Sequence, residues 1–146
     1  MVSSQKIAEK LIALDEFLLL LKEIGSISSE AFLKDKILIG SAKYYLQVSI
    51  ECCLDIANHI IASERFRAPK DYADSFKILE EMNIVPGELS QKLQQMAKFR
   101  NRLVHLYGEI DNQYVYDFMR EDIDNIREFR SMIKNRYLQS GLNGTE

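Results

Sequence analysis

The chain has 146 residues, of which 47% are hydrophobic and 28% are charged, and this length suits one ordinary folded domain. Its 19 basic and 22 acidic side chains give a formal charge of −3. That balance argues against a protein that binds nucleic acid through a generally basic surface, although it is compatible with a local basic site. With only 6 Gly and 2 Pro, the composition also disfavours loop-rich folds and β folds with many turns.

Two features bear on the compartment. Cys52 and Cys53 are adjacent in an apolar segment, and helical neighbours point roughly 100° apart, so we expect reduced core thiols and no bond between them. No Cys or His spacing predicts a metal site. The first residues lack a signal-peptide pattern, and the most apolar segment, 17–21, is too short to cross a bilayer. We therefore expect a cytoplasmic protein without membrane association.

Apolar residues recur every three or four positions in the first half of the chain, which is the period of an amphipathic helix. A first helix is predicted over 4–24, with Gly25 ending it in a left-handed conformation. A second is predicted over 29–63, with a break near 34–35. Because apolar residues cover much of the circumference of this second helix, we expect it to pack against more than one neighbour.

The second half continues the same pattern. Pro69 interrupts the helical period, and Asp71 can cap a third helix that reaches about Met82. A fourth helix is predicted over 87–107, and a fifth from Asp111 or Asn112 to Tyr137.

No segment of the sequence predicts a strand, an internal repeat or a glycine-rich phosphate loop. The sequence therefore predicts an all-α fold, an antiparallel bundle of about five helices. We expect one domain over residues 1–138 and a flexible tail over 139–146, where two glycines and few apolar residues occur.

One stretch, 98–107, is polar and basic within the predicted fourth helix. At roughly 100° per residue, Asn101 and His105 share a face, and Arg100 and Tyr107 nearly eclipse each other two turns apart. Both pairs lie near the apolar packing line of the helix. A guanidinium in such a place needs a partner or a cleft.

These residue types suit chemistry on a phosphate. His105 can accept and donate a proton near neutral pH, and Arg100 offers fixed donors to two phosphate oxygens. Asn101 can orient His105, and Tyr107 can donate its hydroxyl or stack on a base. RNA carries its own nucleophile, the 2′-OH, so a ribonuclease that needs no metal requires little more. The alternative is a set of surface or capping groups, because the C-terminal end of a helix favours basic side chains.

The segment Arg100-Asn101-Arg102-Leu103-Val104-His105-Leu106-Tyr107 resembles the Arg-x4-His-x-Tyr motif of HepT-like proteins, a branch of the HEPN superfamily. Outside the motif, Tyr44–Glu51 with Asp55–His59, Tyr72–Phe76 and Val115–Tyr116 resemble other helices of that family. The resemblance covers residues 5 to 135, and no motif position departs from the pattern.

This resemblance implies a homodimeric helical bundle whose two motifs face a shared cleft. It implies the toxin of a HepT–MntA type toxin–antitoxin pair, a metal-independent endoribonuclease without a cofactor that acts on RNA, with tRNA among the candidate substrates. The implied partner is a minimal nucleotidyltransferase antitoxin that transfers AMP to the motif tyrosine. The number of AMP groups and any assembly beyond the dimer stay open.

Carried over by position, Arg100 and His105 would be catalytic, Asn101 supportive, and Tyr107 the residue that receives AMP. The added phosphate would place negative charge in a site built for phosphate and so repel the substrate. Lys98 and Arg102 are candidates for contacts with the RNA backbone; a solvated basic face is the alternative.

A polar seam follows the second predicted helix at intervals of four, four and three: Gln47, Glu51, Asp55 and Asn58. A shielded carboxylate needs a partner, so Glu51 or Asp55 can pair with Arg100 or orient His105. A purely structural ion pair is the favoured interpretation. His59 stands outside any motif and is interpreted as an ordinary satisfied histidine.

A second function fits the same residues. The chain can instead be a non-catalytic, nucleotide- or substrate-binding subunit of a minimal nucleotidyltransferase. The acidic net charge favours this alternative modestly, because general affinity for RNA would be weak. A purely structural helical dimer would leave the pairing of Asn101 with His105 and of Arg100 with Tyr107 unexplained.

Overall fold

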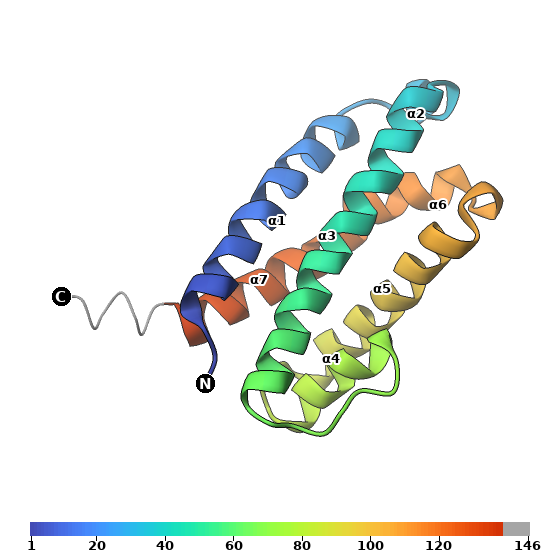
Figure 1. Cartoon of the computed structure of the whole chain (residues 1–146). Helices are drawn as coiled ribbons and strands as arrows, with labels where there is room; N and C mark the ends of the chain where they lie inside the picture. Colours follow the sequence, from blue (N-terminus) through green and yellow to red (C-terminus); the bar gives the residue numbers. More distant parts are fainter. Residues whose placement is uncertain (139–146) are drawn as a thin grey trace.

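A computed structural model describes residues 1–138 of the chain, so the expected tail, 139–146, lies outside the described residues. The described part is helical throughout its ordered elements, as Figure 1 shows. The elements are α1 (Ser4–Gly25), α2 (Ser29–Lys34), α3 (Lys36–Ser63), α4 (Tyr72–Glu81), α5 (Gly87–His105), the short 3₁₀ turn η1 (Tyr107–Glu109), α6 (Asn112–Asp117), the π-helical segment η2 (Phe118–Asp122) and α7 (Ile123–Tyr137).

Helix α3 is the centre of the bundle. It contacts α1, α2, α4, α5, α6 and α7, and α1 and α5 run antiparallel to it on its two sides (Figure 1). The predicted antiparallel all-α bundle is therefore confirmed. Within residues 1–138, no helix combines the length and the low charge that a bilayer crossing needs.

The core explains why α3 is apolar over most of its circumference. Fully buried side chains of α3 meet apolar stripes from every neighbouring helix, and each such Leu or Ile contributes about 1.5–3 kcal/mol. Cys52 and Cys53 lie in this core as free thiols, as predicted, and burial raises the pKa of both. The largest fully buried side chains include Leu14, Phe32, Leu46, Ile50, Ile56, Phe76 and Phe129.

The predicted break in the second helix occurs at Asp35. This residue is extended, and its carboxylate accepts hydrogen bonds from the backbone N–H groups of Ile37 (3.0 Å) and Leu38 (3.1 Å). It therefore caps α3 while ending α2.

The prediction for Gly25 is wrong. Gly25 is the last residue of α1, and no glycine within residues 1–138 has a positive φ. Ser26 closes the helix instead: its hydroxyl donates to the Glu23 carbonyl (2.6 Å), and its N–H reaches the carbonyls of Lys22 and Glu23.

The predicted fifth helix is continuous in direction but not uniform. Asp111 caps it through the N–H of Gln113 (2.9 Å), as expected, and η2 then separates α6 from α7. A π-helical segment shifts the register of a helix locally. Phe118, Met119 and Ile123 are all buried. The spacing of apolar residues does not distinguish this π-helical segment from an unbroken α-helix.

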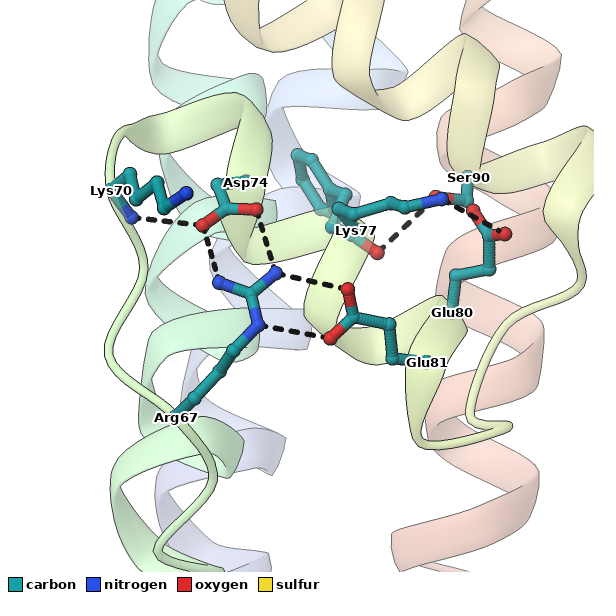
Figure 2. A network of polar contacts seen from close by, with 8 residues as sticks. Arg67, Lys70, Asp74, Lys77, Glu80, Glu81 and Ser90 are labelled. Atoms are coloured by element: carbon teal, nitrogen blue, oxygen red, sulfur yellow. Dashed lines mark hydrogen bonds and ion pairs between the residues drawn. The ribbon is translucent and has the colours of Figure 1, made fainter.

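Arg67 clamps the connection between α3 and α4, as Figure 2 shows. Its guanidinium binds both carboxylate oxygens of Asp74 (2.7 and 2.8 Å) and both of Glu81 (2.9 and 3.1 Å). The hydrogen bonds from Arg67 and from the Lys70 N–H hold the pKa of Asp74 well below its usual range, and Arg67 likewise lowers the pKa of Glu81.

These lowered pKa values predict an acid-dependent contribution to stability. The unfolded carboxyls titrate near about pH 4, so the network stabilises the fold above that pH and loses its effect as the pH falls through the folded values. The free energy of unfolding of the wild type should fall between about pH 5 and pH 2.5, and we expect it to fall less in Arg67→Gln, measured by urea denaturation. The control is Arg65→Gln, since Arg65 is exposed and in no ion pair with another described residue. Equal pH slopes for the two variants would contradict the assignment.

Candidate functional site

Arg100 joins α5 to α3 through Glu51. Its Nε and Nη2 both donate to Glu51 Oε2, at 3.0 and 2.7 Å, and Nη1 donates to Asn101 Oδ1 at 3.2 Å. The Arg100 side chain is only 16% exposed, against 31% for Glu51. A guanidinium has five N–H donors, so two are unbound to any other described residue.

The guanidinium forms one wall of a cavity of about 280 Å³. Glu51 and Tyr72 lie beside it, and the Arg100 guanidinium carbon is 5.0 Å from the centroid of the Tyr72 ring. Other lining residues are Leu54, Asp55 and Asn58. A planar cation over an aromatic face at the edge of a polar cavity is a suitable surface for a phosphate or a base.

The residues of the polar seam bind three different partners, and Asn58 accepts a hydrogen bond from the Ser75 hydroxyl (2.7 Å). Glu51 takes Arg100, as one of the two stated alternatives expected, and Gln47 Nε2 donates to the same Glu51 oxygen (3.2 Å). Asp55 is different: its carboxylate accepts from Lys10 on α1 (2.8 Å) and does not bond to Arg100 or His105. Of the two carboxylates named for this role, Glu51 therefore pairs with Arg100, whereas Asp55 forms an ion pair between α1 and α3.

His105 is the last residue of α5, and its side chain is exposed. No other residue within 1–138 hydrogen-bonds to its imidazole, and Asn101 is occupied by Arg100, so the expected orientation of His105 by Asn101 does not occur in the described chain. The imidazole is therefore open to an incoming molecule, whereas the guanidinium five residues earlier is turned inward against α3.

The predicted fourth helix reaches Tyr107, but α5 ends at His105, with Leu106 N–H closing it on the Arg102 carbonyl (2.8 Å), and Tyr107 begins the turn η1. Arg100 and Tyr107 nevertheless both face α3, at Glu51 and Lys43. Tyr107 is 49% exposed. On α3, a Cβ added to Gly40 would lie 3.5 Å from the Tyr107 hydroxyl.

Lys43, which contacts the motif tyrosine and neither Arg100 nor His105, is a residue that the sequence reasoning missed. It is buried in α3, its Nζ donates to the Tyr107 carbonyl (3.0 Å), and the same atom lies 4.2 Å from the centroid of the Tyr107 ring. Burial lowers the pKa of its ammonium. The signal was available: the four-residue spacing of Asp55, Glu51 and Gln47 reaches Lys43 one step further back.

The two remaining basic candidates, Lys98 and Arg102, are exposed on α5 near the motif. The Arg102 guanidinium carbon lies 5.8 Å from the Tyr114 ring centroid. His59 accepts a hydrogen bond from the Ser3 N–H (3.0 Å), and burial together with nearby positive charge lowers its pKa, which agrees with its interpretation as a satisfied structural histidine. Within residues 1–138, no group of three or more His, Cys, Asp or Glu side chains is arranged to hold a metal ion.

An Arg-x4-His-x-Tyr motif at the end of a bundle helix is the arrangement of a HEPN protein. The family model described as "Ribonuclease HepT-like" matches residues 14–133, and the chain belongs to this HepT-like family. The predicted family membership is thereby confirmed.

Similar proteins agree. The chain is 33% identical over 103 residues to an mRNA nuclease HepT of Shewanella oneidensis, covering 70% of this chain and 77% of that protein, and 31% identical over 88 residues to a putative RNase of Archaeoglobus fulgidus, covering 60% and 66%. Among solved structures, it is similar to the tri-AMPylated Shewanella oneidensis HEPN toxin in complex with MNT antitoxin. The identity is 28% and the TM-score 0.83, over 89% of this chain and 97% of that one.

The burial of Arg100 predicts a measurable coupling with Glu51. In a double-mutant cycle of Glu51→Ala and Arg100→Met, we expect about 1–2 kcal/mol of coupling in the free energy of unfolding. The reason is that the guanidinium is shielded from water and donates two hydrogen bonds to Glu51. Lys10 and Asp55 provide a matched control at the same helix seam. Their side chains are 46% and 52% exposed, so their coupling should stay below about 0.5 kcal/mol. Equal coupling in the two pairs would show that burial does not strengthen the first.

Proposed function

We propose that this protein is the toxin of a toxin–antitoxin pair and an endoribonuclease that cleaves RNA without a metal ion. The observation that carries the proposal is the open imidazole of His105 at the end of α5, on the helix that also holds Arg100. Relatives named as nucleases of mRNA and tRNA, and a similar toxin solved with its antitoxin, support it. A cytoplasmic location, where RNA and ATP occur together, accompanies the proposal.

The chemistry begins at the 2′-OH of the substrate. His105 takes the proton of this hydroxyl, the oxygen attacks the adjacent phosphorus, and the bond from phosphorus to the 5′ oxygen breaks. The leaving oxygen receives a proton from an imidazolium or from water, and a 2′,3′-cyclic phosphate remains. The two unbound donors of Arg100 stabilise the charge that builds on the phosphate oxygens, and Glu51 keeps the guanidinium in place. Lys98 and Arg102 contact the RNA backbone.

A homodimer brings the two groups of the site together. In one protomer Arg100 faces α3 while His105 faces solvent. In the proposed dimer, a second copy related by a twofold axis brings its motif to the same cleft. The end of α5 supports such an association, because it exposes the apolar side chains of Val104 (39%) and Leu106 (46%) beside the motif.

Silencing uses Tyr107. The partner, a minimal nucleotidyltransferase, transfers AMP from ATP to the hydroxyl of Tyr107, a residue that is 49% exposed. The adduct carries a phosphate two residues from His105. Its negative charge repels the RNA backbone and its bulk occupies the cleft.

The catalytic assignment predicts the behaviour of the two histidines. Cleavage of tRNA in EDTA should fall by about 10²-fold or more in His105→Ala, with the free energy of unfolding changed by less than about 0.5 kcal/mol, because the side chain is exposed. His59→Ala is the matched control and should keep its cleavage activity. Wild-type protein that binds nucleotide but cleaves no RNA would instead favour the non-catalytic binding subunit.

The modification site gives a separate test. With the antitoxin and ATP, Tyr107→Phe should gain no AMP by mass spectrometry, since its ring lacks the oxygen that attacks phosphorus. Tyr114→Phe, which alters a tyrosine of similar exposure (42%) nearby, should be modified like the wild type. AMP found on the Tyr107→Phe protein would point to another acceptor.

A further inference from the structure

Lys43 is the one charged side chain that is buried within residues 1–138, with 5% of its surface exposed. No carboxylate of another described residue lies within ion-pair distance of its Nζ. Taking an ammonium out of water is costly unless other groups compensate it. The other contacts of Lys43 must therefore compensate for the burial of its ammonium.

Both of the compensating contacts come from one residue. The Tyr107 carbonyl accepts a hydrogen bond from Lys43 Nζ at 3.0 Å, and the Tyr107 ring presents its face to the same atom at 4.2 Å from the centroid. These contacts hold the backbone and the ring of Tyr107 at once. They fix the start of η1, where α5 has already ended and the chain continues in a short 3₁₀ turn.

Gly40, one turn earlier on α3, completes this arrangement. The Tyr107 hydroxyl lies over it, 3.5 Å from where a Cβ would stand. A Cβ there would be in van der Waals contact with the hydroxyl, and a larger side chain would press against it, so glycine leaves room for the oxygen against the helix in a residue that is half exposed.

We propose that Lys43 is a positioning residue that, with Gly40, seats Tyr107 against α3 so that its hydroxyl is presented for modification. The inference rests on the proposed function, because it concerns the transfer of AMP to Tyr107. In that step the Tyr107 oxygen attacks the α-phosphorus of ATP, a new oxygen–phosphorus bond forms, and the bond to the β-phosphate oxygen breaks. Pyrophosphate leaves, and the phenol proton passes to solvent.

Positioning is worth most for an acceptor on a short turn. A phenol that samples many orientations presents its oxygen to the α-phosphorus only part of the time, whereas a fixed one is near the attacking geometry throughout. RNA cleavage does not share this requirement, since neither Arg100 nor His105 bonds to Lys43 in the described chain.

The experiment measures two activities on the same variants of the full chain. AMP gain at Tyr107 is followed by mass spectrometry with the nucleotidyltransferase antitoxin and ATP, and RNA cleavage is followed on the unmodified protein. We expect Lys43→Met to slow AMP transfer by about tenfold or more while keeping cleavage near the wild-type rate, and Lys43→Arg to restore part of the transfer. Lys36→Met, at an exposed lysine of the same helix, is the matched control and should change neither activity.

A second variant covers the case in which Lys43→Met does not fold. Gly40→Val keeps the ammonium and adds methyl groups beneath the Tyr107 hydroxyl, so AMP transfer should again slow while the fold is retained. Wild-type transfer rates in a folded Lys43→Met or Gly40→Val protein would overturn the inference and leave the proposed function standing. Equal loss of transfer and cleavage in a folded variant would also overturn it. A wild-type protein that gains no AMP at Tyr107 would overturn both the inference and the proposed silencing.

Discussion

A guanidinium shielded from water needs a charged partner, and the pairing of Arg100 with Glu51 is the constraint around which this site is arranged. It fixes α5 against α3 by a polar contact within an otherwise apolar interface. Because Glu51 binds one edge of the guanidinium, two donors remain for a phosphate. The same pair therefore links α5 to α3 and, under the proposed function, holds the cation toward the RNA phosphate.

The helix that supplies Glu51 has to satisfy two demands. As the central element, α3 must be apolar toward all its neighbours, yet it carries a polar seam at four-residue intervals. Lys43 holds Tyr107 at one end of the seam, and Glu51 holds Arg100 two turns further along. One helix face thus supports both halves of the motif, which explains why a long, mostly buried helix contains charged residues at all.

The features that could be predicted from the sequence are those set by local interactions. Asp35 and Asp71 cap their helices by accepting hydrogen bonds from N–H groups only two or three residues away. The helix starts at these residues therefore depend on local sequence and need no tertiary contact. The departures arise where distant contacts decide. Asp55 bonds to Lys10, 45 residues away, because α1 packs there. Likewise, nothing in the sequence marks His105 as the end of α5, since apolar spacing continues through Leu106.

The early end of α5 leaves the motif tyrosine on a turn. In η1, Tyr107 still faces α3, over Gly40 and Lys43, two turns along α3 from the Glu51 that binds Arg100. It is half exposed and lies two residues after an open imidazole. Under the proposed function, the surface that admits RNA to His105 is then the surface that admits a modifying enzyme to Tyr107. On this proposal, the phosphate of AMP lies where the RNA substrate binds. The Coulomb repulsion between this phosphate and the RNA phosphates acts over a short distance, so salt screens it little.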